Sequence, residues 1–474
     1  MNVLVVVADS LRARNIGYHG YPNNTTPFLD SWSKEATTYL QARSPGTDSI
    51  TSHVSMFTGY HVPEHGIVSD EYTLKPGHTI WEELQERGHS TAVFTSNPFF
   101  VDRPIGLTHG FDEKFLKSHI PRFPMGLNPT DYANPDGHPE YLGFAKDAIS
   151  SGKPFRSLLN GTYSQINYLP RNRYPESKYF VKEFLDWQEN QTGPWAGFLN
   201  LMDTHAPYYA QSEYRLWGSS ETRALQQEID EMLWDFVGGR RPWWQRASLE
   251  ALYNNTIRQV DANFKMLIEA LQKRGEYDDT LIIFTGDHGE GFGEESRIRN
   301  GERVATHSQG IHEVMVHVPL IVKYPGQDSA HSIEQVTSLT KIPDVINSVV
   351  QNDWEPTDFT PEGPTISVGP GVDQRAGMLQ NAKKFCGDRF SNFTGEAKAI
   401  YRTSGDTVIK DILWKDSTAT ILSENAQYSY RVGDSDLKIR STFNNLQDND
   451  VAMHSDKEEL SKSVENRLEE LGYR

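Results

Sequence analysis

Three continuous apolar runs constrain the fold of this chain more than any other feature of its sequence. They are Val3–Ala8, Leu281–Phe284 and Val318–Val322. A strand with one face in solvent alternates apolar and polar residues, whereas these runs have no polar position, as expected for strands buried on both faces of a parallel sheet. Each run is far shorter than the roughly 20 apolar residues that a membrane span needs. We therefore predict an α/β fold without a membrane span, in which helices sandwich a mixed, mostly parallel sheet.

Helical segments alternate with these strands. Pro27 after Thr26 marks a helix start, and Thr79 with Glu82 has the pattern of a capping box for a helix over 80–87, followed by a strand over 91–94. A longer apolar stripe at helical spacing precedes Gly275 and is expected to pack in the core. This stripe consists of Leu252, Ile257, Val260, Phe264, Leu267 and Leu271. The strand, helix, strand order supports the α/β prediction.

Composition limits the partners and the location. The chain has 46 basic and 64 acidic side chains and a net charge of −18, which disfavours nucleic acid and anionic lipid as partners. An anionic small substrate would have to be attracted by local positive charge. Cys386 is the single cysteine, so there is no disulfide framework and no thiolate zinc site. The apolar run after Met1 lacks the charged leader of a signal peptide, so we expect a cytoplasmic location.

Acidic residues stand where two of the apolar runs end. Asp9 follows the first run, and Asp287-His288 follows the second after Thr285-Gly286. Ligands of open α/β sheets bind at the carboxyl ends of the strands, so these residues are predicted to converge although they are far apart in the chain.

Five stretches, in this order, resemble the sulfatase family of the alkaline phosphatase superfamily. They are Val7–Arg12, Ser49–Gly59, Leu201–Tyr208, Phe284–Glu290, and Thr306-His307 with the segment from Glu313 to Ile321. The second is similar to the family's nucleophile motif, with Ser49 in the position of the nucleophile. In the family this residue opens a helix, where backbone N–H groups favour an anionic sulfuryl or phosphoryl group.

The resemblance implies a site. Asp9, Asp287, His288 and the Ser49 oxygen would hold one divalent metal ion, and a set of oxygens with one imidazole suits Ca²⁺, Mn²⁺ or Mg²⁺, with Zn²⁺ as a further candidate. His205 and His307 would bind the anion or protonate the leaving oxygen, and His53 would bind the substrate or cap its own helix. The substrate would be an anionic sulfate or phosphate ester.

The resemblance covers roughly the first 350 residues, and the change of pattern after about Gln351 predicts the rest of the domain organisation. Residues 1–350 would form the sulfatase/alkaline phosphatase-like catalytic domain, 351–378 a linker rich in Pro and Gly, and 379–474 a smaller α+β subdomain. In that subdomain we expect strands over 398–401 and 427–432 and a charged helix over 457–471. The stretch 117–175, rich in Pro, Gly, Asn and aromatic residues, is predicted to form long loops over the site.

Several alternatives stay open. Most sulfatases convert a Cys or Ser to formylglycine within a Cys/Ser-x-Pro-x-Arg signal, but Thr51 and His53 replace that Pro and Arg here. A phosphodiesterase or phosphoglycerol-type transferase with an unmodified Ser49 is therefore one alternative. Others are a two-metal phosphatase using Asp203, His205 and His307, and a non-catalytic binding protein on the same fold.

Overall fold

The large sheet is mixed, and all but one of the strands that the structure describes in it run in the same direction. The computed structural model describes residues 1–117, 127, 141–166, 177–229, 234–374, 376–435 and 439–455. Within these residues the sheet has eight strands. In spatial order they are β11 (His331–Ser338), β2 (Thr37–Arg43), β10 (Leu320–Lys323), β7 (Thr280–Gly286), β1 (Asn2–Ala8), β6 (Trp195–Leu201), β4 (Ser90–Thr95) and β5 (Glu113–Leu116).

Strand direction follows the prediction of a mostly parallel sheet and reverses at β10. β7, β1, β6, β4 and β5 are parallel neighbours. β10, which contains most of the third apolar run, is antiparallel to both β7 and β2, while β2 and β11 are parallel. Every residue of β1 and β7 is buried, because helices cover both faces of the sheet. The predicted fold class is confirmed.

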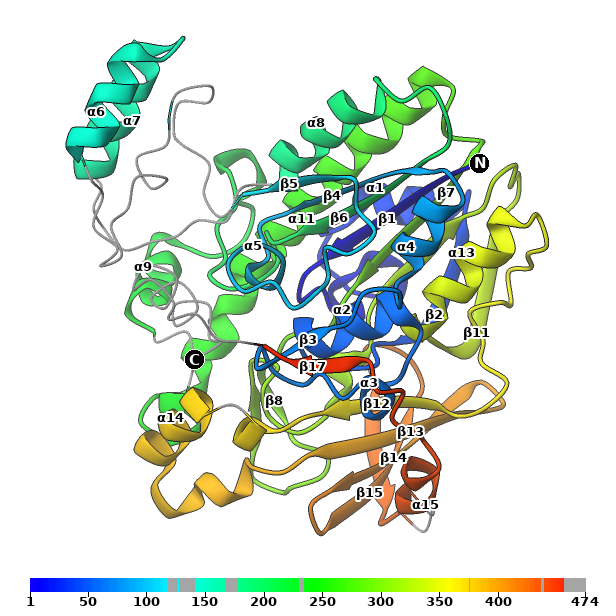
Figure 1. Ribbon diagram of the computed structural model, residues 1–474. Coiled ribbons are helices and arrows are strands. Elements are labelled where there is room, and N and C mark those ends of the chain that lie inside the picture. The colour runs from blue at the N-terminus through cyan, green and yellow to red at the C-terminus, as the bar shows by residue number, and fades with distance from the viewer. Residues whose placement is uncertain are drawn as a thin grey trace.

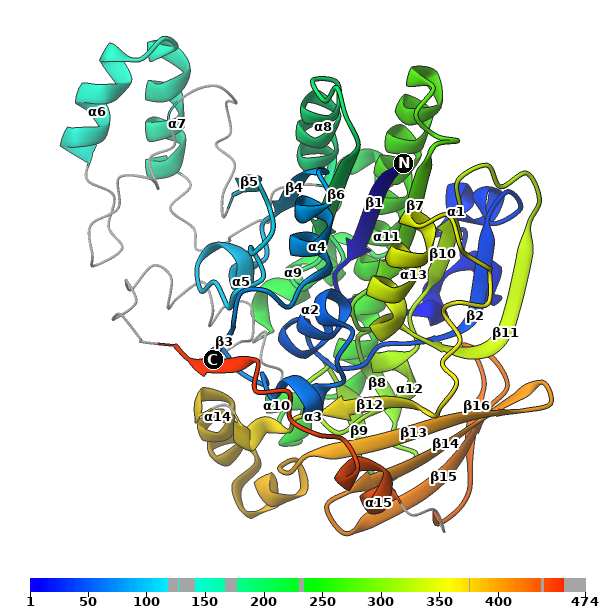
Figure 2. The ribbon, with the colours of Figure 1, turned by 45° about the vertical axis from the view of Figure 1, so that its right-hand side comes forward.

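The helices form two layers around this sheet (Figures 1 and 2). One apolar core joins the sheet to α1 (Pro27–Trp32), α8 (Ser177–Gln188) and α11 (Trp243–Arg274). The second core joins it to α2 (Ser49–Thr58), α4 (Ile80–Glu86) and α13 (Ile342–Val350). The capping box predicted for α4 is present, since the Thr79 side chain accepts from the Glu82 N–H and the Glu82 carboxylate accepts from the Thr79 N–H.

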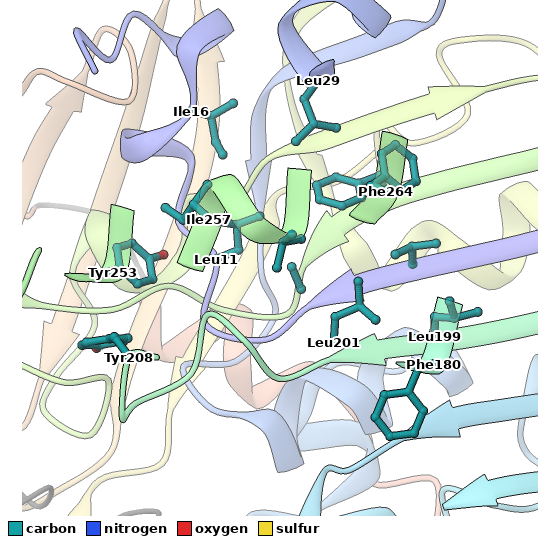
Figure 3. Close-up of a cluster of buried hydrophobic side chains, with 14 of the residues drawn as sticks. Leu11, Ile16, Leu29, Phe180, Leu199, Leu201, Tyr208, Tyr253, Ile257 and Phe264 are labelled. Carbon is teal, nitrogen blue, oxygen red and sulfur yellow. The ribbon is translucent and has the colours of Figure 1, made fainter. Parts of the chain in front are cut away.

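Helix α11 carries the predicted apolar stripe. All six residues of the stripe are buried, and Gly275 ends the helix with a φ of 74°. Figure 3 shows Ile257 and Phe264 in the cluster that also contains Leu11, just beyond the end of β1. This packing fixes the carboxyl end of β1 against the longest helix of the described part of the chain.

A second, antiparallel sheet stands beside the large one (Figure 2). Its strands, in spatial order, are β12 (Thr365–Gly369), β13 (Ala397–Ser404), β14 (Thr407–Trp414), β15 (Ser417–Ser423) and β16 (Ser429–Gly433). It is accompanied by α14 (Ala376–Cys386) and α15 (Ile439–Asn444). β12 falls within the range predicted as a linker; the domain boundaries themselves stay a prediction.

β12 also contacts the large domain. The Val368 N–H donates to the Pro45 carbonyl at 2.9 Å, and the Ser367 hydroxyl donates to the Ser44 carbonyl at 2.5 Å. The two segments form a parallel bridge at Gly46. The backbone that leads into α2 is therefore held by the second sheet.

The stretch 117–175 is not made of long loops throughout. It contains α6 (Tyr141–Ser150) and α7 (Pro154–Ile166), which lie side by side (Figures 1 and 2). Gly161 marks close packing rather than a loop, because a Cβ there would lie 2.5 Å from the Phe144 ring. The predicted helix over 457–471 lies outside the described residues.

The remaining elements are short. They are α3 (Val62–His65), β3 (Tyr72–Leu74), α5 (Pro98–Val101), α9 (Ser220–Glu228), α10 (Trp234–Val237), β8 (Phe292–Glu295), β9 (Arg303–Ala305), α12 (Glu313–Val316) and β17 (Ala452–His454). Among the described helices, none combines the length and apolar character required to cross a membrane.

Candidate active site

Ser49 is the first residue of α2. Asp48 caps this helix, its carboxylate accepting from the Thr51 N–H at 3.1 Å. The side chain of Ser49 is buried at the positive end of the helix dipole, where an anion is favoured. The predicted position of Ser49 at a helix start is therefore observed.

The carboxyl ends of β1 and β7 lie side by side because the two strands pair in parallel. Ala8 pairs with Gly286 across the two strands, so Asp9 and Asp287 follow at the same level. Ser10 has a φ of 60°, and its N–H donates to Asp287 Oδ1 at 2.9 Å. The predicted convergence of the two acids is thus present.

The Ser49 hydroxyl contacts this pair of strand ends. It donates to Asp9 Oδ2 at 3.0 Å and lies 3.5 Å from His288 Nε2. One ligand atom each from Asp9, Asp287 and His288 lies within 4.8 Å of the others, and all three side chains are fully buried. A single ion of the size of Mg²⁺, Mn²⁺ or Ca²⁺ bridges oxygens at such separations.

Two atoms of this cluster, Asp287 Oδ2 and His288 Nε2, have the chemistry of cation ligands. Asp287 Oδ2 is buried and accepts no hydrogen bond, whereas Asp287 Oδ1 accepts from the N–H groups of Ser10 and His288. His288 Nδ1 lies 2.9 Å from the Gly289 carbonyl, which it can contact only as a donor, so Nε2 carries the lone pair. Burial, assisted by His307, lowers the pKa of His288 to about 3, so the ring is neutral. A buried lone pair facing two carboxylates is satisfied by a positive ion.

Sequence reasoning missed Asn97. Its amide Nδ2 donates to Asp9 Oδ2 at 3.2 Å, and its Oδ1 accepts from the Phe99 N–H as the cap of α5. The amide is therefore fixed with its donor towards the site. The available signal was its position just beyond the carboxyl end of β4, followed by Pro98.

Sequence reasoning also missed Glu290 and Arg246. Glu290 Oε2 lies 3.4 Å from His307 Nδ1, and Glu290 Oε1 is paired with Arg246 at 2.9 Å. Burial would raise the pKa of Glu290, but Arg246 and His307 outweigh it and bring this pKa to about 2. Burial likewise opposes the charged form of His307, yet Glu290 raises the pKa of His307 above its ordinary value. A buried carboxylate thus favours a protonated His307.

His307 lies close to both His288 and His205. The His307 ring centroid is 4.4 Å from that of His288 and 5.8 Å from that of His205. His205 Nδ1 lies 2.7 Å from the Ala206 carbonyl, which orients the ring. The Asp203 carboxylate accepts from Ser177 and Gln259. Among the described residues, the group whose spacing could hold a metal ion is Asp9, Asp287 and His288, and Asp203 is not part of it, which argues against the two-metal alternative.

His53 lies one helical turn after Ser49 on α2, next to Asp287. Its Nδ1 is 2.8 Å from the Ser49 carbonyl and 3.6 Å from Asp287 Oδ2. The ring is fully buried and packs edge to face against Phe57, Phe100 and Phe198. This surrounding supports α2 beneath Ser49, and a contact of His53 with substrate stays a prediction.

The fold and this cluster define an α/β protein of the alkaline phosphatase type. The structure resembles a phosphonate monoester hydrolase of Agrobacterium radiobacter with a TM-score of 0.59 and 17% identity, covering 89% of this chain and 88% of that one. It also resembles an alkaline phosphatase superfamily protein from Vibrio parahaemolyticus, with a TM-score of 0.54, 13% identity and coverage of 99% and 86%. At these identities the likeness concerns the fold.

The chain belongs to the sulfatase family, whose model, described as Sulfatase, matches residues 1–352. It is 22% identical to an ulvan-active sulfatase of Formosa agariphila over 74% of this chain and 61% of the relative. It is also 22% identical to arylsulfatase K of Bos taurus, over 72% of this chain and 61% of the relative. The chain thus spans about three-fifths of the length of these relatives.

Proposed function

We propose that this chain hydrolyses a sulfate or phosphate ester, with Ser49 as the nucleophile and one divalent cation held by Asp9, Asp287 and His288. The observation that carries the proposal is that Asp287 Oδ2, the His288 Nε2 lone pair and the Ser49 hydroxyl lie close together in a buried cluster. When bound there, the cation would neutralise the carboxylates and lower the pKa of the hydroxyl. Mn²⁺, Mg²⁺ and Ca²⁺ all suit this ligand set.

Attack by Ser49 opens the reaction. Its Oγ forms a bond to the sulfur or phosphorus while the bond to the leaving oxygen breaks, and the Ser49 proton leaves towards Asp9 Oδ2, the acceptor it already contacts. Water then cleaves the enzyme-bound ester, which releases sulfate or phosphate and restores Ser49. The N-terminus of α2 lies at the same place, and the positive end of its helix dipole favours the transferred anion.

His307 protonates the leaving oxygen in this proposal. Glu290 raises the pKa of His307, so the ring keeps its proton where an ordinary histidine would lose it. Its positive charge also supplies the local attraction that an anionic substrate needs against a net charge of −18. His205, 5.8 Å from His307 between ring centroids, would bind the non-reacting oxygens of the anion.

The state of Ser49 separates the two enzyme alternatives. Formylglycine at this position would favour sulfate esters, and an unmodified serine would favour phosphate mono- or diesters. Thr51 and His53 in place of the Pro and Arg of the formylglycine signal favour the unmodified serine. The relatives include named sulfatases, and the structural neighbours include a phosphonate monoester hydrolase, so both anions belong in the test.

The test is a substrate panel on the purified chain. Aryl sulfate, aryl phosphate and aryl phosphodiester are offered with Mn²⁺, Mg²⁺ or Ca²⁺ and with EDTA, and mass spectrometry of the Ser49 peptide gives its chemical state. We expect cation-dependent turnover that Ser49→Ala abolishes. Equal rates in Ser49→Ala and the parent would refute the nucleophile, and cation binding without turnover would support the binding-protein alternative.

A further inference from the structure

His307 lies on a segment without helix or strand. Residues 306–312 connect β9 to α12. The start of this segment is anchored to the loop between β7 and β8, because Thr306 and Gly291 exchange backbone hydrogen bonds of 3.3 and 3.1 Å. Thr306 has a φ of 59°, so His307 follows a sharp turn. Such a segment keeps its shape only where other parts of the protein press on it.

The second sheet packs against this segment at Gly310. Gly310, with a φ of 67°, packs so closely on Trp414 at the end of β14 that a Cβ there would lie 2.8 Å from the indole ring. Trp414 is 2% exposed, and its Nε1 donates to the Gly395 carbonyl at 3.1 Å. Arg299 stacks over the same ring, 3.6 Å from its centroid. The indole is thus held from several directions.

A buried ionic network fixes the end of the segment. Lys410, also on β14, donates to the Ile311 carbonyl at 3.1 Å and pairs with Glu313 Oε1 at 2.8 Å. The other oxygen of Glu313 pairs with Arg43 of β2 at 2.8 Å. The Lys410 and Arg43 side chains are fully buried. The network ties β14 to the large sheet through the end of the His307 segment.

We infer that Trp414 is a positioning residue for the reaction: the indole of the second sheet presses on Gly310 and thereby holds His307 at the leaving-group side of Ser49. The inference rests on the proposed function, because it needs His307 to act on the leaving oxygen. It makes the second sheet part of the catalytic apparatus without any direct contact between Trp414 and substrate.

The physical argument concerns the space that a smaller side chain would leave. Gly310 has no side chain of its own to fill that space, so the segment can relax towards it and carry His307 away. A displacement of about 1 Å in a proton donor costs up to about 100-fold in rate. The loss should depend on how much the leaving oxygen needs a proton.

The experiment compares two leaving groups. Phenyl and 4-nitrophenyl esters of the anion that the parent hydrolyses fastest are used with Trp414→Phe and Trp414→Leu. We expect Trp414→Leu to lower kcat about 10- to 100-fold for the phenyl ester and less than about 3-fold for the nitrophenyl ester, with KM little changed. Trp414→Phe should show the same pattern at smaller size and serves if the leucine variant does not fold.

The matched control is Trp195, equally buried at 2% exposure but at the start of β6, away from the carboxyl ends of the strands. Trp195→Phe and Trp195→Leu should lower the melting temperature without distinguishing the two esters. Leaving-group profiles that coincide for the Trp414 and Trp195 variants would overturn the inference.

A double-mutant cycle gives the second readout. If Trp414 acts through His307, then Trp414→Leu combined with His307→Ala should be no slower than His307→Ala alone. Multiplying losses would overturn the inference even where Ser49-dependent turnover is intact. Failure of the proposed function looks different: the parent then shows no turnover that Ser49→Ala removes, and the inference falls with it.

Discussion

Asp287→Asn should reverse the order of stability of variant and parent between the metal-free and the metal-loaded state. The asparagine keeps Oδ1, which accepts from the N–H groups of Ser10 and His288, so the hydrogen bond between the residues that follow β1 and β7 is preserved. Its Nδ2 replaces the oxygen that accepts no hydrogen bond. The substitution therefore removes one negative charge from the cluster and leaves its backbone contacts in place.

The magnitude follows from the spacing of the carboxylates. Oxygens of Asp9 and Asp287 lie within 4.8 Å of each other, and two like charges at that distance repel by about 3 kcal/mol at an effective dielectric constant of about 20. Without metal, Asp287→Asn should be more stable than the parent by up to that amount. With metal at about 1,000 times its Kd, the parent gains about 4 kcal/mol that the variant mostly lacks.

Thermal unfolding in EDTA and in excess Mn²⁺ measures both effects. A chain of 474 residues has an unfolding entropy of roughly 1 kcal/mol/K, so each kcal/mol shifts the melting temperature by about 1 °C. We expect the variant to melt about 3 °C above the parent in EDTA and below it in Mn²⁺. If the parent melts higher in EDTA, or if Mn²⁺ stabilises both proteins equally, the reasoning about the cation site is wrong.

Three further predictions concern the proposed nucleophile, the proposed proton donor and the core. Ser49→Ala should lower kcat/KM by at least about 10³-fold with an unchanged melting temperature, as measured on the fastest ester of the panel. Glu290→Gln should move the alkaline limb of the pH–rate profile to lower pH. A proton donor is lost as pH rises through its pKa, and without the Glu290 carboxylate the pKa of His307 falls. An unshifted limb would exclude His307 as the donor. Phe264→Ala should cost about 3–5 kcal/mol in unfolding free energy at constant kcat, checked by urea denaturation, because this ring packs in the core on α11.

Sequence reasoning located the parts of the site that strand ends and motifs define. Apolar runs identify buried strands, and the carboxyl end of a parallel strand is a fixed place in the fold, so Asp9 and Asp287 could be paired without coordinates. Ser49 was found through its motif, and its place at the start of α2 agrees with it. The predictions made for His205, His307 and His53 as catalytic groups stay predictions.

The residues that were missed act through tertiary neighbours. Glu290 comes shortly after β7, but it was missed because its partners are distant in the sequence. It pairs with His307 on a later segment and with Arg246 on α11. Asn97 gains its role from the order of strands, which places β4 near β1 with β6 between them. No local pattern encodes these distances, because they depend on how the sheet is assembled.

The backbone contacts of β12 with Pro45 and Gly46 determine where this protein can be truncated. Cutting the chain where the family match stops, at residue 352, would remove β12, whose Val368 N–H donates to the Pro45 carbonyl just ahead of the helix that begins at Ser49. It would also expose an apolar surface of the remaining piece that the second sheet covers. Fragments intended for biochemistry should therefore retain the second sheet, since stopping at the homology boundary yields a truncated fold rather than a minimal enzyme.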